Sequence, residues 1–355
     1  MSELRCFVGS YAELSYGIAI LGIDTAKGSM RFLRVERGIE RPSYLRVSGD
    51  RRFLYAACKR TEFADTGGGA LAAYAIAEGG QLRFINAKPS YGGPPCYIMT
   101  DKDDKYVFAA NYREGNGAIY ALQQDGSISG EGQKIQHTGS GPHPERQTSA
   151  HMHCMEPDPD SKIVYAVDLG LDAVLAYALA DGEKMLIRLP EADLHEALGA
   201  GPRHMIFNRS GSRAYVINEL HCSVSVWNLE DPNNPDRMQT VDMLPAIWQD
   251  KENTAAAIKL SEDGRYLACS NRGHDSIIFY TIDAKSGLLS LNGRYPCAGS
   301  GPRDFAFVPG GKYVLVAHQW SDTVALHRYE EGSLVVEPTQ ILTLEQQPVC
   351  LKFFQ

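Results

Sequence analysis

The sequence predicts an all-β protein, a seven-bladed β-propeller with four-stranded blades. Two observations predict this fold. A hairpin pattern recurs seven times along the 355 residues, at intervals of 46 to 57 residues, and each end of the chain carries only part of such a unit. A ring of repeats accounts for the whole length, so we expect residues 1–355 to form a single domain and not the two domains that length alone allows.

Each repeat begins with a β-hairpin. In the repeat that starts at Pro202, an apolar run leads into the turn 208–211, and a second run ends at Asn218. Short runs rich in Val, Ile, Tyr and Phe around such turns are typical of hairpins. A further pair of runs, such as 223–229, brings each repeat to about four strands. The repeats start near Pro42, Pro95, Met152, Pro202, Ala255, Pro302 and Pro348.

The two chain ends complete one blade between them. Residues 348–355 supply one inner strand, whereas residues 6–11 align with residues 107–112, the second strand of another repeat. We therefore expect the C-terminal strand to join the N-terminal blade and close the ring, which removes free sheet edges. A closed ring needs no partner, so we expect a monomer or a weak homodimer. Helix should be almost absent, with one turn at 194–198 as the best candidate.

Composition and charge exclude several classes of protein. The formal net charge of −8 gives no basic footprint for nucleic acid. No apolar stretch approaches the roughly 18 residues of a membrane span, and the first residues do not resemble a signal peptide. The eight cysteines are widely spaced without a C-x-x-C pair, which indicates reduced, packed thiols. We therefore expect a cytoplasmic protein that binds neither nucleic acid nor membrane.

The hairpin register brings charged residues together at one mouth of the central channel. Arg203 and Glu219 are equidistant from the turn at Gly211, so they should be cross-strand neighbours. The same register aligns other repeat positions with these two. His153 and Arg303 align with Arg203, and Arg272 aligns with Glu219.

These charges have a structural and a functional interpretation. Arg203 and Glu219 alone would be an ordinary cross-strand ion pair. Three arginines and a histidine around one obvious acid leave a positive surplus, however, in a protein of negative net charge. A ligand with a carboxylate or phosphate would satisfy that surplus, because guanidinium groups bind both in a bidentate manner.

A long polar connection, residues 139–153, leads into this mouth. We expect Arg146, Gln147 and His151 from this segment to help bind the substrate. Its three histidines suggest a metal site as an alternative. A His-x-His pair in an extended segment, however, supplies only two ligands. General acid–base or hydrogen-bonding chemistry is therefore favoured, and we expect neither a metal nor a cofactor.

Four segments carry a resemblance to a known family. They are 146–153 (RQTSAHMH), 167–172 (VDLGLD), 201–204 (GPRH) followed by 215–220 (YVINEL), and 270–276 (SNRGHDS). In combination they resemble the seven-bladed propeller lactonase family, which includes the propeller type of 6-phosphogluconolactonase and the fungal carboxy-muconate lactonizing enzyme. The resemblance implies a cytosolic, metal-independent enzyme that opens, or in the fungal case forms, a lactone ring on an acidic substrate.

The family's functional positions fall on His153, Arg203, Glu219 and Arg272. Met152 stands between the two histidines where the family often has Pro, so His151 and His153 both stay open as the group that handles the proton. We expect hydrolysis of a small anionic sugar-acid lactone, with a 6-phosphogluconolactonase-like activity. Arg203 and Arg272 would bind the anion and polarise the carbonyl. Either Glu219 or His153 would activate water, with His153 favoured for the proton and Glu219 for orientation, because a glutamate held between two arginines is a poor base.

Two alternatives remain at this stage. A muconate-type cycloisomerase would use the same side chains, and a non-catalytic propeller would bind a metabolite or a protein on its rim. The identity of the lactone is also open.

Overall fold

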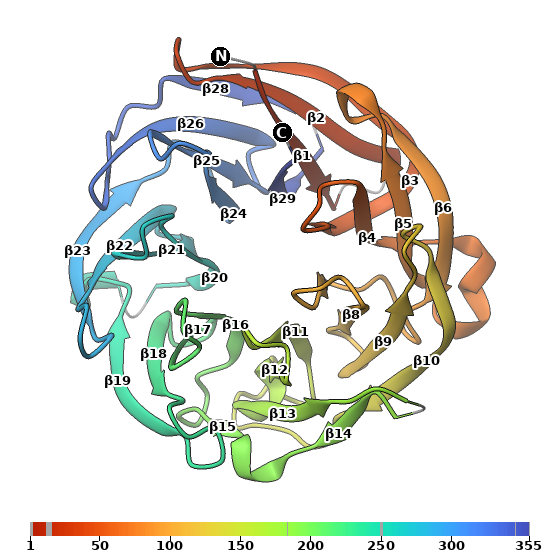
Figure 1. The fold of residues 1–355 in the computed structure, drawn as a ribbon. Coiled ribbons are helices and arrows are strands. Elements are labelled where there is room, and N and C mark those ends of the chain that lie inside the picture. The colour runs from red at the N-terminus through yellow and green to blue at the C-terminus, as the bar shows by residue number, and fades with distance from the viewer. Residues whose placement is uncertain (1–2, 12–15, 183, 249–250, 345, 355) are drawn as a thin grey trace.

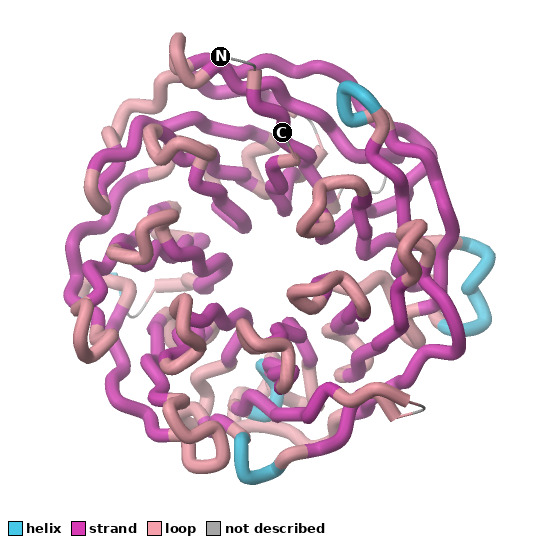
Figure 2. The backbone as a smooth tube through the Cα atoms, in the orientation of Figure 1, coloured by secondary structure: helices cyan, strands magenta, loops and turns pink. Residues whose placement is uncertain are grey.

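The computed structural model describes residues 3–11, 16–182, 184–248, 251–344 and 346–354. In this part of the chain, antiparallel strands form seven blades around a central axis (Figure 1). Strands and loops make up nearly all of the ring, with only a few short helical turns (Figure 2). The all-β, seven-bladed prediction is confirmed.

The blades follow one another along the chain, each with its first strand innermost. In chain order the blades comprise the end of β3 (Ser29–Val47), β4 (Phe53–Lys59), β5 (Gly69–Ile76) and β6 (Leu82–Pro89); β7 (Tyr97–Thr100), β8 (Tyr106–Asn111), β9 (Asn116–Leu122) and β10 (Ile128–Gln136); β11 (Met152–Pro157), β12 (Ile163–Asp168), β13 (Ala173–Leu179), β14 (Leu186–Arg188) and β15 (Leu194–His195); β16 (Pro202–Phe207), β17 (Arg213–Asn218), β18 (Ser223–Asn228) and β19 (Asp236–Asp242); β20 (Thr254–Leu260), β21 (Tyr266–Arg272), β22 (Ser276–Ile282) and β23 (Leu289–Pro296); β24 (Pro302–Phe307), β25 (Tyr313–His318), β26 (Thr323–Glu330), β27 (Ser333–Leu334) and β28 (Gln340–Thr343); and β29 (Pro348–Phe353), β1 (Leu4–Ser10), β2 (Tyr16–Asp24) and the start of β3.

The last blade joins the two ends of the chain. β29 pairs antiparallel with β1, with Cys6 opposite Phe353 and Val8 opposite Leu351. β3 then continues from the outer edge of this blade to the inner position of the next. The predicted closure by the C-terminal strand is therefore present. The two partial repeats at the chain ends form one sheet.

The predicted helical turn at 194–198 is wrong. Leu194 and His195 form β15, which pairs with β13. The edge of β13 offers hydrogen bonds where β14 has ended, whereas an isolated helical turn has a costly nucleus. The helical segments are short 3₁₀ turns: η1 (Thr61–Thr66), η2 (Glu78–Gly80), η3 (Leu169–Leu171), η4 (Pro190–Ala192) and η5 (Ala246–Trp248).

The core lies within and between neighbouring blades. Tyr120, Tyr215 and Tyr280 are among its largest fully buried side chains, and their hydroxyls donate to backbone carbonyls of Pro89, Gly287 and Asp242. All eight cysteines are buried and free of disulfides, as predicted for packed thiols. No helix among the described residues is long and apolar enough to cross a bilayer.

The inner hairpins differ from the predicted register in one respect. Pro202 pairs with Asn218 and His204 with Ile217, which leaves Arg203 in a β-bulge and not directly opposite Glu219. The same irregularity occurs between Met152 and Cys154 and between Pro302 and Asp304. A bulge breaks the strict alternation of side chains, so two consecutive residues of an inner strand both reach the channel.

Candidate active site

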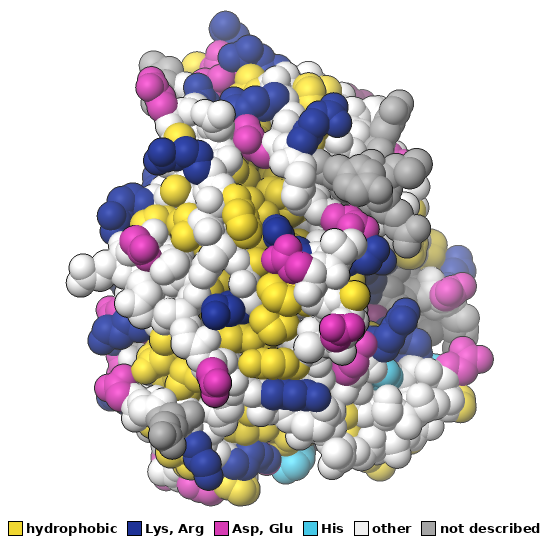
Figure 3. Space-filling view, turned by 90° about the vertical axis from the view of Figure 1, so that its right-hand side faces the viewer, with side chains coloured by type: hydrophobic (Ala, Val, Ile, Leu, Met, Phe, Trp, Pro, Cys, Tyr) yellow, Lys and Arg dark blue, Asp and Glu magenta, His cyan; other side chains and the backbone are white. Residues whose placement is uncertain are grey.

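A cavity of about 800 Å³ lies at the predicted mouth of the channel. Its charged lining among the described residues consists of five arginines and three glutamates: Arg41, Arg113, Arg146, Arg272, Arg303, Glu114, Glu219 and Glu252. The outer side of the ring drawn in Figure 3 instead mixes both charge signs with stripes of hydrophobic atoms. That side of the ring does not show the surplus of arginine found at the mouth.

The carboxylate of Glu219 is the centre of this charge cluster. Its Oε2 lies 3.0 Å from Nε of Arg203 and 3.1 Å from Nη2 of Arg272. Its Oε1 accepts a hydrogen bond of 2.5 Å from Nη2 of Arg146. Glu219 follows β17 directly, and its backbone N–H donates to the carbonyl of Gly201. One carboxylate therefore holds three guanidinium groups.

These contacts keep Glu219 ionised. Burial alone would raise the pKa of Glu219, but the positive charges of Arg272 and Arg203 outweigh burial and hold it well below its ordinary value. A carboxylate with so low a proton affinity is a poor general base. It is suited to holding and orienting its partners.

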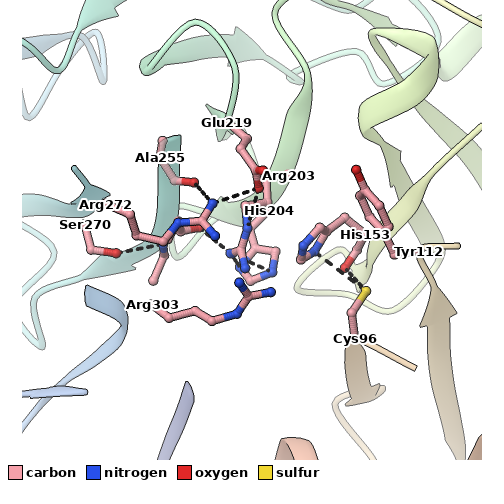
Figure 4. A network of polar contacts seen from close by, with 12 residues as sticks. Cys96, Tyr112, His153, Arg203, His204, Glu219, Ala255, Ser270, Arg272 and Arg303 are labelled. Carbon is pink, nitrogen blue, oxygen red and sulfur yellow. Dashed lines mark hydrogen bonds and ion pairs between the residues drawn. The ribbon is translucent and has the colours of Figure 1, made fainter. Parts of the chain in front are cut away.

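Backbone carbonyls of β20, which is in the neighbouring blade for Arg203 and in the same blade for Arg272, fix two of the arginines. Nη1 of Arg203 donates to the carbonyl of Ala256, and Nη2 of Arg272 donates to that of Ala255. The guanidinium groups of Arg203, Arg272 and Arg303 point toward the same central space, which His153 faces from the other side (Figure 4).

His153 is buried, with 4% of its surface exposed. Burial and the positive charge of Arg203 lower the pKa of His153 well below its ordinary value, so the imidazole is neutral. Its ring packs edge-on against those of Tyr112 and His204, with centroids 5.6 and 5.1 Å away. A neutral imidazole can accept a proton from water.

Cys96 lies beside this histidine but is not a plausible nucleophile. Its Sγ is 3.8 Å from Nδ1 of His153, yet burial raises the pKa of the Cys96 thiol to about 12. The reactive form of cysteine is the thiolate, so the side chain is inert at neutral pH.

Arg303 differs from the arginines that hold Glu219. Its Nη2 donates to the Tyr11 hydroxyl at 3.3 Å, and its Nη1 donates to Oε1 of Gln319 at 3.2 Å. Its Cζ lies 4.7 Å from the centroid of the Tyr11 ring. In the described part of the chain no carboxylate is within ion-pair distance of Arg303, so its charge is available to a ligand.

The polar segment 139–153 is divided between the cavity and the wall behind it. Arg146 lines the cavity and also donates to the Tyr112 hydroxyl. Gln147 is fully buried, and its amide donates to the carbonyl of Leu169 and to Oδ1 of Asp172. Gln147 therefore lies behind the mouth, where it holds the loop.

His151 also lies behind the mouth. Its ring stacks on Tyr112 with centroids 4.5 Å apart, and its Nδ1 hydrogen-bonds the Tyr112 carbonyl. His143 accepts backbone hydrogen bonds from Glu145 and Arg146 at Nδ1. Among the described residues, no three His, Cys, Asp or Glu side chains are grouped as a metal site would require.

Residues 5–353 match the family model described as "Lactonase, 7-bladed beta-propeller". The chain belongs to the seven-bladed β-propeller lactonase family. A relative named 6-phosphogluconolactonase, from Bacillus subtilis (strain 168), is 33% identical to this lactonase over 99% of both chains. Another of that name, from Formosa agariphila, is 30% identical over 95% of this chain and 96% of its own.

A solved structure supports the same assignment. The periplasmic gluconolactonase of Pseudomonas aeruginosa is 33% identical and superposes with a TM-score of 0.91 over 99% of each chain. Family membership and these relatives together support lactone hydrolysis as the general activity of this lactonase.

Several cavity residues of this lactonase were not predicted. Tyr11 and Tyr112 follow β1 and β8 directly, as Glu219 follows β17, and the alignment of residues 6–11 with 107–112 contained that signal. His204, which packs against His153 but is not part of the cavity lining, was also missed, because strict alternation would turn its side chain to the opposite face from that of Arg203. The bulge removes that alternation. Asn253 comes from the loop before β20, and Trp320 comes from the turn after β25.

Proposed function

We propose that this lactonase hydrolyses the lactone of a phosphorylated sugar acid in the 800 Å³ cavity. The observation that carries the proposal is the contrast between two kinds of arginine. Arg146, Arg203 and Arg272 share the carboxylate of Glu219, whereas Arg303 faces the cavity and has no acid partner among the described residues. A phosphate on the substrate would form an ion pair with Arg303.

The lactone carbonyl would then lie against Arg272, which lines the cavity, while the buried guanidinium of Arg203 contacts the same Glu219 oxygen. When water attacks the carbonyl carbon, negative charge develops on the carbonyl oxygen, and fixed guanidinium groups in a dry site stabilise that charge. Glu219 keeps both groups in place through its Oε2 contacts. These cationic side chains supply the electrostatic stabilisation, so the proposed chemistry needs no cofactor.

The proton of the attacking water would move to His153. Burial, and after it the positive charges of Arg203 and Arg303, depress the pKa of His153 in the free protein. An anionic substrate offsets those charges, which raises the proton affinity of the imidazole when the reaction requires it. The tetrahedral intermediate then breaks its ring C–O bond, and His153 returns the proton to the departing alkoxide.

A panel of lactones tests the proposal. In a pH-stat, 6-phosphogluconolactone, unsubstituted gluconolactone and a muconolactone would be compared, with cis,cis-muconates assayed in the reverse direction. We expect the phosphorylated lactone to have the highest kcat/KM. Cyclisation of a muconate without sugar-lactone hydrolysis would instead favour the cycloisomerase, and binding without turnover of any compound would favour the non-catalytic propeller.

We also propose a single-domain, cytoplasmic protein that is a monomer or a weak homodimer. The pairing of β29 with β1 supports one cooperative unit, and eight buried free cysteines are typical of a reducing compartment. Light scattering tests the oligomeric state, and calorimetry tests whether the chain unfolds as one domain. Cell fractionation tests the location, with the periplasm as the contrary result, as described for the Pseudomonas relative.

A further inference from the structure

A second ring of side chains faces the central channel beyond the active site. The inner strands all begin at the mouth, and three residues after the bulge position they present another side chain to the channel, roughly 10 Å further along. The seven residues at this position are partly exposed: Arg46, Met99, Glu156, Ile206, Lys259, Ala306 and Lys352. We refer to them as the far-end ring.

Three cations of the far-end ring come from three different strands. Arg46 lies on β3, Lys259 on β20 and Lys352 on β29. Burial lowers the pKa of Lys352, and the positive charges of Lys259 and Arg46 contribute to the same shift. The three side chains therefore lie close enough to repel one another.

Acidic neighbours balance these cations only in part, because one of the three, Lys259, has an ion-pair partner among the described residues. Nζ of Lys259 lies 3.3 Å from Oδ1 of Asp304, whose other oxygen accepts a hydrogen bond from the backbone of Leu351. Among the described residues, no carboxylate is within ion-pair distance of Arg46 or Lys352. Nε of Arg46 donates to Oγ1 of Thr100, and Nζ of Lys352 lies 4.8 Å from the centroid of the Tyr44 ring.

Glu156 belongs to the far-end ring but is turned toward a different partner. Its Oε2 accepts a hydrogen bond of 2.5 Å from the Tyr97 hydroxyl. Burial raises the pKa of Glu156 to about 7 in spite of the nearby cations. Its carboxyl thus supplies only part of a negative charge near neutral pH.

We propose that the far-end ring binds a second phosphate group, held by Arg46, Lys259 and Lys352. Clustered cations of low exposure are costly without a counter-charge, and a phosphate offers several oxygens to three donors at once. The site is separate from the active-site mouth and does not depend on the lactonase proposal. Because Lys352 lies on the strand that closes the ring, bound phosphate would also link β29 to β3 and β20.

Equilibrium dialysis with radiolabelled inorganic phosphate tests the site in the full chain. We expect wild-type protein to bind one phosphate more than the Lys352→Met variant, whose lactone hydrolysis should stay within about twofold of wild type. Arg303→Gln, at the mouth, should retain the far-end phosphate. Lys162→Met removes an exposed lysine elsewhere and should bind as much phosphate as wild type.

Thermal unfolding gives a second measurement on the same variants. Phosphate should raise the unfolding midpoint of the Arg303→Gln variant, because binding stabilises the folded state. The increase should be smaller in the Arg303→Gln/Lys352→Met double variant. Lys259→Gln replaces Lys352→Met if the latter does not fold. Equal phosphate binding by wild type and both far-end variants would overturn the proposal. Displacement of the label by a phosphorylated sugar acid at lower concentration than by unlabelled phosphate would identify the sugar acid as the natural source of the phosphate group.

Discussion

Oε2 of Glu219 lies 3.1 Å from Nη2 of Arg272, across the boundary between two neighbouring blades. Glu219 follows β17, and Arg272 ends β21. The same oxygen lies 3.0 Å from Arg203. The cluster at the mouth therefore depends on how the blades are arranged around the ring and not on one hairpin alone.

Replacing Glu219 with Gln should destabilise the fold by about 3 kcal/mol at pH 7, because buried guanidinium groups lose their counter-charge. The pKa of Glu219 is lower in the folded protein than its ordinary value of 4.5. Its ionised form therefore stabilises the fold fully above about pH 4.5, and this contribution is lost as the pH falls below that value.

Denaturant unfolding at pH 7 and at pH 3.5 measures this difference. The gap between wild type and Glu219→Gln should narrow at the lower pH. Glu191→Gln, at an exposed position, is the matched control and should follow wild type at both pH values. A gap that is the same at both pH values would show that the carboxylate charge is not the stabilising element.

Replacing Arg303 with Gln should raise KM for a phosphorylated lactone by about 10- to 100-fold, the equivalent of one charge-assisted hydrogen bond. kcat should change much less, since Arg303 is proposed to hold the phosphate and not the reacting carbonyl. Steady-state kinetics with phosphorylated and unphosphorylated gluconolactone check this. Equal increases in KM for both substrates would contradict the assignment.

The fold was largely predictable because its signals repeat. Pro202, Pro302 and Pro348, identified as repeat starts, are the first residues of β16, β24 and β29. Proline is tolerated at the first position of a strand, where its missing N–H matters least. Because proline recurs at the starts of several strands, the length of the repeat can be determined even where the ends of a single strand cannot.

The site was predictable only in part. The repeat register brought His153, Arg203, Glu219, Arg272 and Arg303 to one mouth, but it could not predict the bulge at Arg203, which depends on pairing with β17. The orientations of Gln147 and His151 depend on partners distant in sequence, Asp172 and the Tyr112 backbone. Periodicity carries no information on those contacts.

Gly170 provides a test of how the loop behind the mouth positions Arg146. A Cβ at this position would lie 1.9 Å from the carbonyl oxygen of Ser149. Gly170→Ala should therefore displace the loop, destabilise the fold by about 1–3 kcal/mol and lower kcat/KM. Gly49→Ala, whose Cβ would meet its nearest atom at 3.4 Å, should have little effect on either unfolding or kinetics.

The most direct test of the account compares His153→Ala with His151→Ala in the hydrolysis of a phosphorylated gluconolactone. His153 lines the cavity, whereas His151 stacks behind Tyr112. If His153 carries the proton, kcat of His153→Ala should fall by about 10²- to 10⁴-fold, and His151→Ala should lose far less. A large loss in His151→Ala together with near-normal turnover in His153→Ala would contradict the proposed mechanism.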